Sequence, residues 1–138
     1  MNTFRQKTIL VVEDEALLRF SIADALEDSG YAVLEASTVL EAVGKLGQYE
    51  EIDVVLTDVD LPGALNGLDL ARMVAECAPH IGIIVSSARR ACDLAGLPSA
   101  AHCLPKPFTP VGLLSSVGRV LSAKAAEAEK SAASRRSA

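Results

Sequence analysis

Five short runs of apolar residues, separated by segments with helical spacing, constrain the fold of this chain more than any other feature. The runs are too apolar to leave one face in water, so each is predicted to be a strand of a sheet covered on both faces, and the first run, which is β-branched, is predicted to be a buried strand. Apolar residues recur at helical spacing after each of the first three runs and again after the fifth. The predicted strands are Thr8–Val12, Tyr31–Ala36, Asp53–Thr57, Ile81–Val85 and Ala101–Leu104.

This alternation predicts an α/β fold, a flavodoxin-like doubly wound sheet of five parallel strands with helices on both faces. The fourth helix, between the fourth and fifth strands, is expected to be short or absent because Gly96 and Pro98 oppose a long one. One globular domain is expected over residues 1–121. Residues 122–138 are Ala, Ser and charged residues, which predicts a helical extension or a disordered tail.

Composition narrows the classes of partner. The formal net charge of −5 and a pI near 5.0 argue against a broad basic face for nucleic acid. The N-terminal segment is neither a signal peptide nor a membrane span. Three cysteines, an odd number without regular spacing, indicate reduced thiols in the cytoplasm instead of a disulfide framework.

Acidic, hydroxyl and basic side chains follow four of the five predicted strands. Ligands of an open parallel sheet bind beyond the carboxyl ends of its strands, so these side chains are expected to meet there. Clustered carboxylates repel one another and need a cation, and oxygen ligands in a small open site suit Mg²⁺. A carboxylate nucleophile with a metal, an ammonium and a hydroxyl group suits phosphoryl transfer onto an Asp. The residues are Glu13, Asp14, Asp58, Asp60, Ser87 and Lys106.

Each of these residues also has a purely structural interpretation. A strand-end Asp often caps a helix, and the Glu13–Asp14 pair could serve the dipole of the following helix. A small residue such as Ser87 is common after a strand, and most lysines are solvated. The functional interpretation depends on the whole set, because its members fall at one end of the sheet in four separate junctions.

Four segments, VVEDE, LTDVDLPG, IIVSSA and LPKPF, resemble the motif regions of response-regulator receiver domains of two-component signalling. The resemblance extends from about Thr8 to Leu121. It implies that Asp58 accepts the phosphoryl group from a histidine kinase or a histidine phosphotransfer protein. Such a domain catalyses only its own phosphorylation and dephosphorylation, and its output is a changed protein-binding surface.

The same resemblance assigns the other site residues. Asp14 would bind Mg²⁺ directly, Glu13 largely through water, and Asp58 would also bind the metal. The carbonyl group of Asp60 would complete the protein ligands. Ser87 would be the switch hydroxyl, and Lys106 would pair with the phosphoryl group, held by a cis bond to Pro107.

The sequence departs from the common family pattern in three places. The loop Pro62–Gly67 is one residue longer, and the stretch between Ser87 and Lys106 is shorter. Cys103 stands where the family usually has a switch Tyr or Phe. One hypothesis is therefore that phosphorylation orders the basic segment Arg89–Ser99 instead of rotating an aromatic ring; the alternative is a surface loop with solvated arginines.

Other functions fit less well. LTDVD resembles the nucleophile motif of haloacid-dehalogenase phosphatases, but that family carries it on the first strand of a longer chain. A flavodoxin-type FMN carrier would need a phosphate loop where VVEDEALL places acids. An interaction module that is never phosphorylated would be expected to lack one of the key residues. The expected form is a stand-alone receiver, although a receiver excised from a hybrid kinase has the same sequence features.

Overall fold

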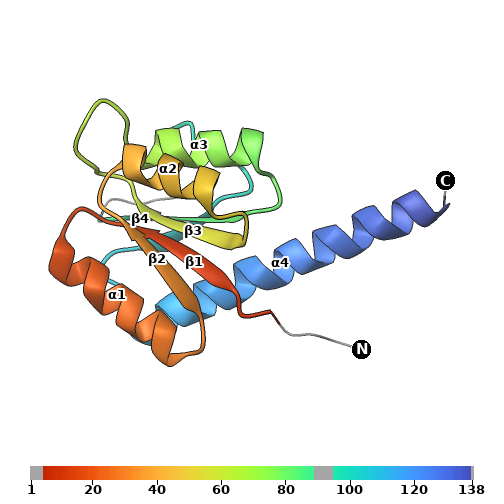
Figure 1. Ribbon diagram of the computed structural model, residues 1–138, viewed down its shortest axis with the longest axis horizontal. Coiled ribbons are helices and arrows are strands. Elements are labelled where there is room, and N and C mark those ends of the chain that lie inside the picture. The colour runs from red at the N-terminus through yellow and green to blue at the C-terminus, as the bar shows by residue number, and fades with distance from the viewer. Residues whose placement is uncertain (1–4, 89–94, 138) are drawn as a thin grey trace.

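The structure, a computed structural model, describes residues 5–88 and 95–137. Five parallel strands form one sheet in the order β2-β1-β3-β4-β5, as the sequence predicts (Figure 1). The described residues contain four helices, and the last is the longest. The elements are β1 Thr8–Val12, α1 Ala16–Asp28, β2 Ala32–Ala36, α2 Val39–Gln48, β3 Ile52–Asp58, α3 Gly67–Cys77, β4 Gly82–Ser87, β5 His102–Pro105 and α4 Pro110–Ser137.

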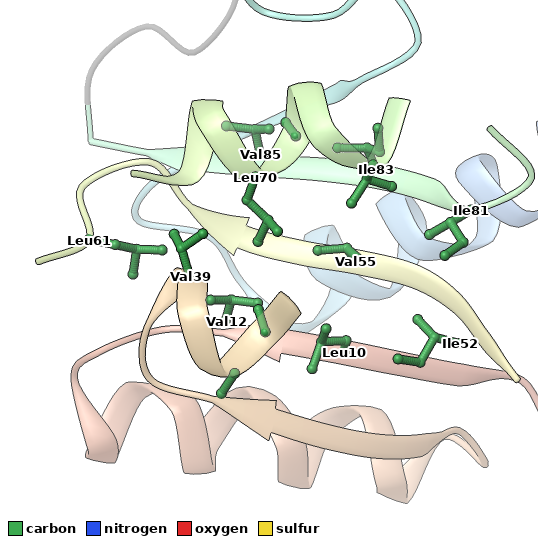
Figure 2. Close-up of a cluster of buried hydrophobic side chains, with 14 of the residues drawn as sticks. Leu10, Val12, Val39, Ile52, Val55, Leu61, Leu70, Ile81, Ile83 and Val85 are labelled. Carbon is green, nitrogen blue, oxygen red and sulfur yellow. The ribbon is translucent and has the colours of Figure 1, made fainter. Parts of the chain in front are cut away.

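Helices cover both faces of the sheet, which makes the fold doubly wound. Helices α2 and α3 lie on one face, and α1 and the first part of α4 lie on the other (Figure 1). Side chains alternate along each strand, so the strands supply two separate aliphatic cores. On the α2–α3 side, Leu10, Val55 and Ile83 from three strands pack under Leu70 of α3 (Figure 2). The other core packs Ile9, Leu56 and Ile84 against α1 and α4, among other residues.

Three strands end later than the sequence predicts. Strand β5 spans His102–Pro105 instead of Ala101–Leu104. Strand β3 continues to Asp58 instead of Thr57, and β4 continues through Ser86 to Ser87 instead of ending at Val85. These extensions are paired, because Asp58 is in register with Ser86 and Ser87 with Pro105 of β5. Backbone pairing with neighbours therefore extends these strands beyond their apolar centres.

The connection from β4 to β5 has an anchor on α3. The described residues of this connection, 88 and 95–101, lie in no helix. Arg89 and Arg90, which begin the basic segment that phosphorylation is expected to order, lie outside the described residues. Gly96 adopts a φ of +82°, a conformation that favours glycine, and its carbonyl accepts a 2.9 Å bond from Arg72 Nε on α3.

Helix α4 does not end near residue 121, where the globular domain was expected to end, but continues to Ser137. The predicted tail is therefore helical through that residue. The second half of α4 projects from the domain (Figure 1). Lys124 Nζ donates a 2.9 Å bond to the carbonyl of Pro79 just before the projection. Within the described ranges, no helix combines the length and hydropathy needed to cross a membrane.

Candidate functional site

Three carboxylates from two strand ends converge at the carboxyl edge of the sheet. Glu13 and Asp14 follow β1, and Asp58 is the last residue of β3, the strand paired beside it. One oxygen ligand from each residue lies within 4.8 Å of the other two. Glu13 and Asp58 are buried, whereas Asp14 is exposed. This donor set of three hard oxygen ligands, open to water on one side, fits Mg²⁺.

Lys106 connects two of these carboxylates from the end of β5. Its Nζ atom lies 2.9 Å from Glu13 Oε1 and 3.4 Å from Asp58 Oδ1. The peptide bond from Lys106 to Pro107 is cis, as the sequence predicts. Parallel pairing brings the two residues together although Glu13 and Lys106 are 93 positions apart.

Burial dominates the acid–base properties of the site. Loss of hydration raises the pKa of Glu13 and of Asp58, and in each case this outweighs the opposing attraction of Lys106. Burial also opposes the charge of Lys106, but its hydrogen bond to Glu13 and the charges of both acids together raise its pKa. The ammonium group therefore stays charged, and it is shared between two partners.

A close backbone approach, which the sequence did not reveal, fixes the segment after Asp58. The amide of Gly67 donates a 2.9 Å bond to the carbonyl of Val59. A Cβ atom on Gly67 would overlap the backbone carbonyl of Asp58, so only glycine fits there. The preceding Asn66 caps α3 in a capping box with Asp69, which holds this end of the loop.

The remaining predicted site residues occupy different environments. Asp60 is exposed, and its carboxylate is not part of the described carboxylate cluster; the resemblance assigns its carbonyl, not its side chain. Ser87 is fully buried at the end of β4. Ser86 is the register neighbour of Asp58, and its Oγ atom is buried without a hydrogen-bond partner among the described residues. Cys103 is half-buried in β5, in register with Val85.

Comparison with known proteins identifies this arrangement. Residues 9–118 match the family described as "Response regulator receiver domain". The chain belongs to this family. Receiver domains are signalling modules, not conventional enzymes; they bind Mg²⁺ at an acidic pocket, are phosphorylated by histidine kinases and relay the signal to output partners. The resemblance drawn from the four sequence motifs is thus confirmed.

The relatives differ in how much of their own length the chain covers. The chemotaxis protein CheY of Thermotoga maritima is 32% identical over 120 residues, which are 83% of this chain and 97% of that protein. The phosphate regulon transcriptional regulatory protein PhoB of Pseudomonas aeruginosa is 38% identical over 120 residues, but the same 83% of this chain spans only 52% of it. A response regulator receiver protein from Sinorhizobium medicae superposes with a TM-score of 0.80 at 30% identity, covering 88% of this chain and 99% of that one.

Proposed function

We propose that this protein accepts a phosphoryl group on Asp58 in a Mg²⁺-dependent reaction and thereby changes a protein-binding surface. The observation that carries the proposal is the convergence of Asp58 with Glu13, Asp14 and Lys106 at one sheet edge. The donor is a histidine kinase or a histidine phosphotransfer protein, as for other members of the family. We place the protein in the cytoplasm, where its cysteines would remain reduced.

Asp58 is the proposed nucleophile because it is the last residue of β3 and occupies the phosphoacceptor position of the family motif in LTDVDLPG. A carboxylate oxygen of Asp58 forms a bond to phosphorus while the bond from phosphorus to the donor nitrogen breaks. The donor imidazole leaves with that electron pair, and the product is an acyl phosphate. Lys106, 3.4 Å from Asp58 Oδ1, is close enough to pair with the oxygens of the incoming group.

Asp14, Asp58 and the carbonyl of Asp60 are the proposed direct metal ligands, and Glu13 is assigned to the same ion through water. When bound, Mg²⁺ supplies positive charge to the phosphoryl oxygens. The Lys106 bond to Glu13 Oε1 leaves that carboxylate oriented by a neighbour, which suits an indirect role. Asp14 is exposed and therefore accessible to a partly hydrated ion.

Ser87 is the proposed switch hydroxyl, and it donates to the phosphoryl group once that group is present. Its burial at the end of β4 and its register with Pro105, next to Lys106, support this role. In place of the family's aromatic ring, β5 carries Cys103, a much smaller side chain. We therefore keep as a proposal that the readout involves the segment after β4 and not the rotation of a ring.

Phosphorylation of Asp58 can be tested with acetyl phosphate and Mg²⁺, followed by intact mass measurement. The wild-type protein is expected to gain one phosphoryl group, and Asp58→Ala is expected to gain none. Asp24→Asn, which changes an exposed acid on α1, is the matched control and should behave like wild type. A full mass gain in Asp58→Ala would reject the assignment of the acceptor.

A further inference from the structure

The backbone of Glu13, between β1 and α1, is held on both sides. Its amide donates a 3.0 Å bond to the carbonyl of Ala36, which continues the pairing of β1 with β2. Its carbonyl accepts a 2.8 Å bond from Nη1 of Arg19. A peptide group is planar, so fixing this carbonyl also fixes the plane that leads into Asp14.

Arg19 is itself held in place. Its Nε atom donates a 3.0 Å bond to Glu35 Oε1 on β2, and its side chain is only 15% exposed. Its guanidinium group also lies over the ring of Phe20, 5.2 Å from the ring centroid. A planar guanidinium group can hold a carboxylate and a carbonyl at the same time in a fixed geometry. Arg19 therefore ties the loop after β1 to β2.

Asp14 is the member of the carboxylate cluster that most needs such support. Glu13 and Asp58 are buried and each contacts Lys106, whereas Asp14 is exposed. Among the described residues, the Asp14 carboxylate has no hydrogen bond or ion pair that would orient it. Its position therefore depends on its backbone, whose preceding peptide plane is set by Arg19.

We propose that Arg19 is a positioning residue for the metal site, acting on Asp14 through the carbonyl of Glu13. This inference rests on the proposed function, since it assumes that Asp14 binds Mg²⁺. Loss of Arg19 lets the Glu13–Asp14 peptide rotate, and the carboxylate then pays an ordering cost each time it binds the ion. The expected effect is on Mg²⁺ affinity, not on the phosphorylation rate once Mg²⁺ saturates the site.

The test compares Arg19→Gln with Arg72→Gln. Arg72 on α3 makes the same two kinds of contact, an ion pair with Asp69 and a bond to the backbone carbonyl of Gly96. Neither contact involves Glu13, Asp14 or Asp58. Calorimetric titration should show Mg²⁺ binding to Arg19→Gln weakened by about tenfold, the lower end of the loss typical for residues that orient metal ligands. Arg72→Gln should bind Mg²⁺ like wild type.

Kinetics and a second variant separate positioning from general stability. With acetyl phosphate, the rate for Arg19→Gln should approach the wild-type rate at high Mg²⁺. Glu35→Gln keeps the bond from Arg19 to Glu13 but holds Arg19 less firmly. It should therefore weaken Mg²⁺ binding, but less than Arg19→Gln does. The same variant provides the test if Arg19→Gln does not fold.

Three outcomes would overturn the inference but not the proposed function. Asp14→Asn weakens Mg²⁺ binding while Arg19→Gln does not, or Arg72→Gln weakens Mg²⁺ binding as much as Arg19→Gln. The third is a phosphorylation rate for Arg19→Gln that stays low at saturating Mg²⁺. If the wild-type protein neither binds Mg²⁺ nor gains a phosphoryl group, the proposed function and this inference fall together.

Discussion

Ser86→Ala tests whether the resting site carries an unfavourable buried hydroxyl group. Ser86 is 3% exposed and lies in register between Asp58 and Leu104, with no hydrogen-bond partner for its Oγ atom among the described residues. A buried hydroxyl without a partner costs about 1–3 kcal/mol. Removing it also loses a few packing contacts of one atom, each worth about 0.1–0.2 kcal/mol. We expect the free energy of unfolding to rise by about 1 kcal/mol, or about 3–5 °C in melting temperature.

Thermal unfolding followed by circular dichroism in metal-free buffer measures this change, since the chain has no Trp for fluorescence. Ser116→Ala is the matched control, because Ser116 is 6% exposed and its Oγ atom lies 3.1 Å from His102 Nε2. The free energy of unfolding of Ser116→Ala should fall by about 1 kcal/mol. Ser115→Ala, exposed on the same helix, measures the gain in helix propensity that must be subtracted. If Ser86→Ala is destabilised as much as Ser116→Ala, the Ser86 hydroxyl has a partner and the reasoning is refuted.

Three further predictions concern the site and its surroundings. Phosphorylation-induced chemical shift changes at β5 should shrink in Ser87→Ala and persist in Ser86→Ala; the reverse pattern would mean that the other serine faces the phosphoryl group. Gly67→Ala should lower the free energy of unfolding in urea by roughly 1–3 kcal/mol, since its Cβ atom would overlap the last carbonyl of β3; an unchanged midpoint would contradict this. Burial and then the charge of Arg119 lower the pKa of His102, so the folded state binds this proton less readily than the unfolded chain. Stability should therefore fall as the pH drops below about 6.5 and through the lower folded-state pKa, and His102→Asn should flatten that decline in urea titrations.

Sequence patterns predicted the centres of the elements better than their ends. The apolar runs identified all five strands. The inner strands β1, β3 and β4 are mostly buried, as predicted, whereas the edge strands β2 and β5 are only partly buried because each has one neighbour in the sheet. Thr38 and Glu41 stand three positions apart before a helical pattern, which predicts a capping box, and only half of it forms. Thr38 Oγ1 accepts a 3.1 Å bond from the amide of Glu41, but the Glu41 carboxylate accepts from the hydroxyl of Ser37 instead of the backbone. The hydroxyl of Ser37 and the backbone amide of Thr38 are competing donors for one carboxylate, and the sequence alone does not show which of them it accepts from.

The carboxylates of the site were predictable because parallel strands bring their carboxyl ends to one edge. The contacts that hold these carboxylates in place were not predictable from the sequence. The bond from Arg19 to the Glu13 carbonyl depends on how α1 lies against β2, and the approach of Gly67 to Asp58 depends on how the loop returns to β3. The register of Ser86 with Asp58 depends on how far β4 continues. Each of these contacts involves the backbone, and the residue types concerned are unremarkable in the sequence.

If Mg²⁺ binds as proposed, the charges of the site give a reason for it to bind before the phosphoryl group. The described cluster brings three carboxylates together, and Lys106 is the ammonium shared by two of them. Burial raises the pKa of both shared acids more than the charge of Lys106 lowers it. Phosphorylation would add further negative charge at the same place, about −1.5 to −2 on the phosphoryl group. A bound divalent cation would balance the three carboxylates together with Lys106, so an incoming phosphoryl group would meet a neutral site and not an acidic one.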